Sequence, residues 1–166
     1  MLISTQQFKK LARRVLHSIL FILVSVWVLL CLLLYLFQPR FIYFPQSEID
    51  YTPDMAGLPY EDIYFKTEDN VLLNGWFIPV ENAKNTLLFF HGNGGNISHR
   101  FETVIFLLQR GVNVMMFDYR GYGRSSGSPT ETNTYGDVKA AYDWLIAVKQ
   151  AEPNDIIIFG RSLGGA

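Results

Sequence analysis

A serine between glycines constrains the fold of this chain more than any other feature. Residues 160–164 read Gly-Arg-Ser-Leu-Gly and follow the apolar run at 156–159. This spacing directly after a buried strand is typical of a sharp strand-to-helix turn that holds the serine hydroxyl out at the edge of a sheet. Such a turn leaves no room for side chains at Gly160 and Gly164. Ser162 is therefore a candidate nucleophile.

From residue 61 onward, short apolar runs alternate with segments of helical periodicity. Strands are expected at 63–65, 71–78, 86–90, 112–117 and 156–159, and helices at 100–110 and from Thr134 to Val148. Asp69-Asn70 is a plausible hairpin turn between the first two strands, because Asn tolerates positive φ. Thr134, with Asp137 three residues on, is the expected start of the second helix. The alternation predicts an α/β fold with a hairpin, then mainly parallel strands and helices on both faces.

The N-terminal part contains an apolar stretch at 15–37, interrupted only by His17, Ser18, Ser25 and the single Cys31. These 23 residues would extend about 34 Å as a helix, enough to cross a bilayer core of about 30 Å. A cleaved signal peptide has an apolar region of only about 7–15 residues ending in small residues. This stretch ends in Tyr-Leu-Phe, which favours a retained transmembrane helix.

The charges around this stretch predict its orientation. Lys9, Lys10, Arg13 and Arg14 precede it, whereas only Arg40 lies close after it. The positive-inside rule then places the N-terminus in the cytoplasm and the rest of the chain on the extracytoplasmic side of a single-pass membrane protein.

The charge of the chain argues against a nucleic-acid partner, and its cysteine content excludes an intramolecular disulfide. Residues 38–166 carry ten Lys or Arg against fifteen Asp or Glu, and this acidic balance argues against a nucleic-acid partner. The only cysteine lies in the apolar stretch, so no intramolecular disulfide can form. The lipid bilayer is the expected partner of the N-terminal part.

Residues 38–60 carry several prolines, which prevent a long helix, and aromatic residues that suit the headgroup region of a membrane. Two interpretations stay open for this segment. It is either a juxtamembrane connector or a packed entry segment of the following domain.

Two further glycine-rich loops follow predicted strands, at residues 91–96 (His-Gly-Asn-Gly-Gly-Asn) and 118–125 (Asp-Tyr-Arg-Gly-Tyr-Gly-Arg-Ser). Glycines in the first let backbone N–H groups approach an anionic oxygen, as an oxyanion hole requires. No Lys-Ser or Lys-Thr follows them, and Ser126 stands where a dinucleotide fingerprint needs its third glycine. We therefore expect no nucleotide, other cofactor or metal. The plain interpretation of the second loop is that Asp118 and Arg120 hydrogen-bond neighbouring backbone.

These three motifs, in this order, resemble the signature of the α/β-hydrolase superfamily. The closest likeness is to its membrane-anchored, serine-aminopeptidase-like branch of abhydrolase-domain proteins, and it covers about residues 38–166. The resemblance implies the N-terminal half of an α/β-hydrolase sheet after one transmembrane helix. The expected parts are a cytoplasmic basic segment at 1–14, a transmembrane helix at 15–37, a juxtamembrane connector at 38–60 and a truncated hydrolase domain at 61–166.

The resemblance also implies roles for individual residues. Ser162 would attack an ester, thioester or amide of a small acyl substrate, and the backbone N–H groups of Asn93 and Leu163 would bind the oxyanion. The residues expected to support the loops are His91, Gly92, Asp118, Arg120, Gly160 and Gly164.

One departure from the family bears on activity. In this family the triad acid and histidine follow the serine, whereas the sequence printed here ends at Ala166. His91 and His99 are weak substitutes for the base, because both precede the serine. The expectation is a truncated N-terminal part of a membrane-anchored serine hydrolase, inactive alone. The alternative is a non-catalytic membrane-anchored interaction protein whose open strand edge pairs with a partner or with itself.

Overall fold

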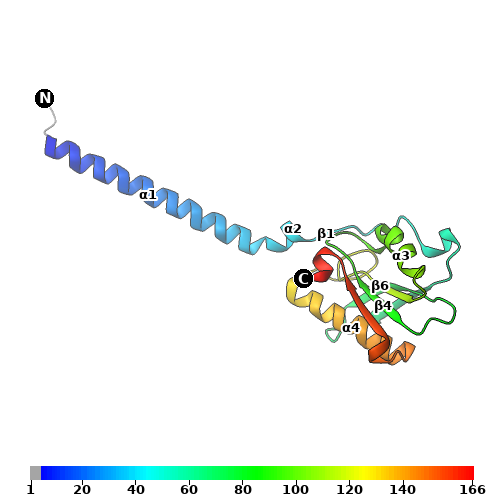
Figure 1. Cartoon of the computed structure of the whole chain (residues 1–166). Coiled ribbons are helices and arrows are strands. Elements are labelled where there is room, and N and C mark those ends of the chain that lie inside the picture. The colour runs from blue at the N-terminus through cyan, green and yellow to red at the C-terminus, as the bar shows by residue number, and fades with distance from the viewer. Residues whose placement is uncertain (1–4) are drawn as a thin grey trace. The chain divides into compact units, whose positions relative to one another are not determined.

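The computed structural model describes residues 5–166. The chain forms two compact units, and the boundary between them lies between Phe41 and Ile42 (Figure 1). The first unit is dominated by helix α1, Thr5–Leu36, and the short helix α2, Gln38–Ile42, follows. No side chain of α1 is buried, and its most apolar 18-residue window has a mean hydropathy of 3.0. By length and composition, α1 is able to cross a bilayer. It begins ten residues before the predicted apolar span and so includes the basic residues.

The second unit is built on a five-stranded sheet in the order β2-β3-β6-β4-β7. The strands are β2 Glu61–Lys66, β3 Leu72–Ile78, β4 Thr86–Phe90, β6 Asn113–Phe117 and β7 Ile156–Gly160. β2 and β3 form an antiparallel hairpin, β3 pairs antiparallel with β6, and β4 pairs in parallel with both β6 and β7. Asn70 in the hairpin turn has a φ of 63°. The predicted α/β class, with a hairpin followed by parallel strands, is confirmed.

Two helices cover opposite faces of this sheet. They are α3, Phe101–Leu108, and α4, Glu131–Lys149 (Figure 1). Strand β4, which lies between β6 and β7, is buried on both faces: Leu87 and Phe89 pack in one core cluster with α3, and Leu88 and Phe90 in another with α4. This two-sided burial explains why β4 appears in the sequence as a continuous apolar run rather than an alternating one.

Helix α4 begins earlier than the sequence pattern predicts. Its N-cap is Thr130, whose hydroxyl oxygen accepts a hydrogen bond from the Asn133 backbone N–H at 3.3 Å. Thr134, the predicted start, lies inside the first turn and donates its hydroxyl to the Glu131 carbonyl at 2.8 Å. The prediction is wrong because two threonines four residues apart offer similar capping groups, and only Thr130 has the extended backbone that an N-cap needs.

The segment that follows Ile42 is hydrogen-bonded into the second unit. Strand β1, Phe44–Pro45, pairs in parallel with β5, Gly94–Gly95. The Asn96 side-chain amide donates to the carbonyls of Gln46 and Glu48. These contacts favour a packed entry segment over a free connector for the part after Ile42.

The end of β7 packs backbone on backbone against its surroundings. After Gly160 the chain turns into the short 3-10 helix η4, Ser162–Gly165. A Cβ on Gly164 would overlap the carbonyl group of Phe90 in β4, and one on Gly160 would overlap the carbonyl of Gly164. Both glycines are thus required by close approach, as the motif predicts.

Gly164→Ala is expected to destabilise the domain by about 1–3 kcal/mol, because a methyl group there displaces the turn from β4. Gly165→Ala is the matched control: its Cβ would lie 3.5 Å from the nearest atom, an ordinary contact. Denaturant unfolding of the three proteins in detergent measures the difference. Equal midpoints for both variants and the wild type would show that the turn does not pack as described.

Asn96→Ala is expected to cost about 2–3 kcal/mol, because it removes the buried amide that donates to the carbonyls of Gln46 and Glu48 and the side-chain cap of the helix that starts at Ile97. Asn154→Ala, at an exposed asparagine, is the control and is expected to stay within about 0.5 kcal/mol of wild type. Thermal unfolding followed by circular dichroism checks both, and a loss no larger than the control's would contradict this role of Asn96.

Candidate active site

The three glycine-rich loops meet at the edge of the sheet where the parallel strands end. The Arg161 backbone N–H donates to the Phe90 carbonyl at 3.0 Å, which joins the ends of β7 and β4. An ideal Cβ on Gly92 would lie 3.5 Å from the Cβ of Ser162. The Ile97 N–H donates to the Asp118 carboxylate at 2.9 Å, which joins the loops after β4 and β6. Carboxyl-end loops of an open α/β sheet are the usual place for a ligand.

Ser162 lies at the strand-to-helix turn with a backbone φ of 54°. Positive φ is uncommon for a residue with a side chain, and such backbone strain is concentrated at functional sites. The residue is exposed, and its hydroxyl makes no hydrogen bond within residues 5–166. The hydroxyl is therefore held in the open, as a nucleophile needs to be.

The backbone N–H of Asn93 is left without a hydrogen-bond acceptor among the described residues, although most of the other polar groups of this residue are bonded. Its carbonyl accepts hydrogen bonds from the Phe44 N–H at 3.1 Å and the Tyr122 hydroxyl at 2.8 Å, and its side-chain amide donates to the Ile42 carbonyl at 2.8 Å. Burial raises the pKa of Tyr122 to about 12, so the phenol stays protonated and able to donate. Across the described part of the chain, the Asn93 N–H has no acceptor, and the same holds for the N–H of Leu163. Both are available to an oxyanion.

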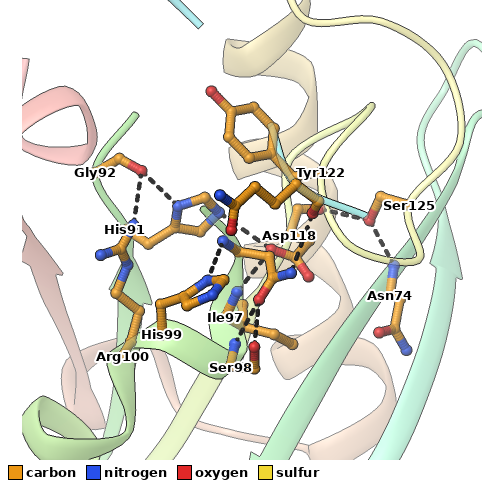
Figure 2. Close-up of polar contacts among 12 residues, drawn as sticks. Asn74, His91, Gly92, Ile97, Ser98, His99, Arg100, Asp118, Tyr122 and Ser125 are labelled. Atoms are coloured by element: carbon orange, nitrogen blue, oxygen red, sulfur yellow. Dashed lines mark hydrogen bonds and ion pairs between the residues drawn. The ribbon is translucent and has the colours of Figure 1, made fainter. Parts of the chain in front are cut away.

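His91 is fully buried beneath the first loop (Figure 2). Its Nδ1 lies 2.7 Å from the Gly92 carbonyl oxygen. A carbonyl oxygen can only accept, so Nδ1 carries a proton. Its Nε2 lies 3.4 Å from Asp118 Oδ1. Both ring nitrogens therefore face the interior and not Ser162.

Asp118 is completely buried beside His91, and its Oδ2 has no hydrogen-bond partner among the described residues. Burial raises the pKa of the Asp118 carboxyl, while the adjacent His91 opposes that rise. The Ser125 hydroxyl donates to the Asp118 carbonyl at 2.6 Å and accepts from the Asn74 N–H at 2.9 Å, which ties the second loop to β3 (Figure 2).

The side-chain contacts of Arg120 differ from those expected from the sequence. Its guanidinium binds carboxylates rather than neighbouring backbone: Asp137 of α4 at 2.8 Å and Asp69 of the hairpin turn at 2.8 Å. Both carboxylates hold the pKa of Arg120 above its usual value. Arg120 thus braces the second loop against α4 and the hairpin, far in sequence from both partners.

His99 has neither ring nitrogen free. Its Nδ1 accepts from the Asn96 N–H at 3.0 Å, and its Nε2 donates to Asp50 Oδ2 at 2.8 Å. The third histidine, His17, lies in α1. Within residues 5–166, no histidine is positioned to take a proton from Ser162.

Arg100 contacts the first loop but did not stand out in the sequence, and no role was expected for Asn96 or Tyr122 within the loop motifs. The Arg100 guanidinium donates to the carbonyl of Gly92 (Figure 2) and to that of Gly94. Its sequence position indicated only the start of a helix. Because the acceptors are main-chain carbonyls, no pattern of side chains could have indicated them.

The described residues hold no group of three or more His, Cys, Asp or Glu side chains that could bind a metal ion. The predicted catalytic and oxyanion-hole residues do lie together, at the carboxyl ends of β4 and β7. Their chemical roles stay predictions.

The chain was compared with known proteins. Residues 85–166 match the family model described as the alpha/beta hydrolase fold. The chain is 41% identical over 142 residues to an alpha/beta hydrolase domain-containing protein of Arabidopsis thaliana, covering 81% of this chain and 46% of that one. It is 36% identical to an uncharacterized membrane protein of Saccharomyces cerevisiae, covering 80% of this chain and 49% of the yeast protein.

Solved structures give the same result. An esterase from Pyrococcus furiosus matches 73% of this chain and 49% of its own, with a TM-score of 0.63 and 33% identity. The chain thus spans about half the length of the curated relatives it matches. The family model, the relatives and the solved structure point to the same family, and the chain belongs to the α/β-hydrolase superfamily.

Proposed function

We propose that this chain carries the nucleophile and the oxyanion hole of a membrane-anchored serine hydrolase. The observation that carries the proposal is Ser162, held at positive φ with a free hydroxyl, beside a loop in which the Asn93 N–H has no hydrogen-bond acceptor in the described part of the chain. The structurally similar Pyrococcus furiosus protein is an esterase, which makes a carboxylic ester the first substrate class to assay.

The chemistry is acyl transfer. Ser162 Oγ attacks the carbonyl carbon of an ester, thioester or amide while a base removes its proton, and the N–H groups of Asn93 and Leu163 bind the oxyanion. The proton passes to the leaving group as its bond to the acyl carbon breaks. Water then cleaves the acyl-serine by the same steps.

The base has to come from outside the described residues. His91 and His99 each have both ring nitrogens turned to other groups, and His17 lies in α1. A serine hydroxyl without a base stays protonated, and loss of a triad costs on the order of a million-fold in turnover. We therefore propose that residues 1–166 alone are inactive and that a further segment or chain supplies the histidine and its acid.

Membrane attachment through α1 is part of the proposal. The helix is long and apolar enough to span a bilayer, and the similar yeast protein is described as a membrane protein. Lys9, Lys10, Arg13 and Arg14 at its N-terminal end favour a cytoplasmic N-terminus, with the domain on the opposite side.

A second candidate function is supported by the exposed edge of the sheet. β7 is an edge strand, and Ile157, Ile158 and Phe159 are 40%, 56% and 37% exposed. An apolar strand edge of this kind is suited to pairing with another chain. A non-catalytic interaction protein would pair through this edge and would show no serine-dependent chemistry in any form.

Ser162→Ala is expected to abolish labelling by a fluorophosphonate probe in the longest form of the protein that its gene encodes, because the probe reacts only with an activated serine. Residues 1–166 alone are expected to show no labelling at Ser162. Gel fluorescence and peptide mass spectrometry measure both.

Ser128→Ala, at an exposed serine three residues after the second loop, is the matched control and is expected to label like wild type. Labelling that persists in Ser162→Ala would overturn Ser162 as the nucleophile. Strong Ser162 labelling of residues 1–166 alone would contradict the missing base.

A single introduced cysteine tests the orientation. Met55→Cys, at a side chain that is 71% exposed, is expected to react with a membrane-impermeant maleimide in intact cells, whereas Gln6→Cys is expected to react only after lysis. The native Cys31 lies in the apolar part of α1, and Cys31→Ser removes any background. The reverse pattern of labelling would place the domain in the cytoplasm.

A further inference from the structure

The Gly92–Asn93 peptide carries the proposed oxyanion donor at one end and a hydrogen-bonded carbonyl at the other. A trans peptide is planar, so its C=O and N–H point in opposite directions. His91 Nδ1 donates to the Gly92 oxygen at 2.7 Å (Figure 2). A group that holds the Gly92 carbonyl toward the interior therefore points the Asn93 N–H in the opposite direction, away from His91.

Arg100 binds this carbonyl as well. Its Nη2 lies 3.4 Å from the Gly92 oxygen and also donates to the Gly94 oxygen, so one guanidinium nitrogen contacts the carbonyls on both sides of Asn93. Rotation of either peptide would break one of these bonds. Arg100 thus holds the Gly92–Asn93 peptide, which carries the Asn93 N–H, and the Gly94–Gly95 peptide that follows it in the loop.

The opposite side of Asn93 is held by different elements. Phe44 and Tyr122 bind its carbonyl, and the Ile42 carbonyl binds its side chain. Those groups fix where Asn93 lies, but none of them contacts the peptide that contains its N–H. Among residues 5–166, only His91 and Arg100 hydrogen-bond to that peptide, and Arg100 also donates to the Gly94 carbonyl.

The charge of Arg100 adds a second effect. A cation on a peptide carbonyl polarises that peptide and makes its N–H a stronger donor. Burial and the positive charge of the nearby Arg161 lower the pKa of Arg100, whereas the Asp118 carboxylate opposes this. A guanidinium stays protonated in proteins, so this charge also favours a developing oxyanion.

We infer that Arg100 is a positioning residue of the oxyanion hole, which orients and polarises the Gly92–Asn93 peptide without touching the substrate. The inference rests on the proposed function for its catalytic consequence, but the orientation of the peptide can be tested without activity.

Arg100→Met is expected to lower kcat for a p-nitrophenyl ester by about tenfold to a hundredfold, in the longest form of the protein that its gene encodes, because a misaligned oxyanion donor acts mainly in the transition state. KM should change by less than about threefold. Arg100→Lys, which keeps the charge on a flexible stem, is expected to recover part of the loss. Arg110→Met, at an exposed arginine that only stacks on Phe106, is the matched control and should behave like wild type.

The second measurement uses residues 1–166 in detergent, labelled with nitrogen-15. Arg100→Met is expected to move the Asn93 amide proton resonance upfield, whereas Arg110→Met leaves it in place. Circular dichroism confirms that each variant is folded, and Arg100→Lys replaces Arg100→Met if the latter unfolds.

If Ser162-dependent activity is present, and Arg100→Met changes neither kcat nor the Asn93 amide resonance, the positioning role of Arg100 is overturned. A rise in KM at constant kcat overturns it too, since that result means ground-state binding. If no form shows Ser162-dependent activity, the proposed function fails, and the Asn93 resonance still decides whether Arg100 holds the peptide.

Discussion

The carbonyl group of Phe90, at the end of β4, is the point on which the geometry of the site depends. It accepts the Arg161 N–H, and it packs so closely against Gly164 that no side chain fits between them. The same residue is followed directly by His91, where the first loop begins. One peptide group therefore places the nucleophile turn and the oxyanion loop against each other, and it does so through backbone atoms that a change of side chain elsewhere does not move.

The parts of the fold that were predictable from the sequence depend on local signals. β4 and β6 were evident because burial on both faces requires continuous apolar runs, and the turn at Gly160 because close backbone approach requires glycine at fixed spacing. The start of α4 was missed because two threonines compete as caps. Arg120 was placed in the correct loop but with the wrong partners, since Asp69 and Asp137 reach it only once the hairpin and α4 pack together.

The sequence alone does not indicate which ring nitrogen of His91 or His99 carries a proton. His91 donates from Nδ1 to a carbonyl, whereas His99 accepts at Nδ1 and donates from Nε2. Their protonation patterns are opposite because Nδ1 of His91 faces a neighbouring carbonyl, whereas Nδ1 of His99 faces a neighbouring N–H, and the backbone conformation of the loop decides which. In both cases the consequence is a loop whose hydrogen bonds are already made before any substrate arrives. Such preorganisation is what makes backbone N–H groups effective toward a developing negative charge.

The first loop is held from two sides, and one of them precedes the sheet in sequence. Residues 42–50 supply the Ile42 carbonyl and the Phe44 N–H to Asn93, the Gln46 and Glu48 carbonyls to Asn96, and the Asp50 carboxylate to His99. A domain boundary drawn at residue 60 would remove all of these partners and leave buried polar groups unpaired, each at a cost of about 1–3 kcal/mol. The scaffold of the candidate site therefore begins at Ile42, and the segment after α2 is part of the folded second unit rather than a spacer.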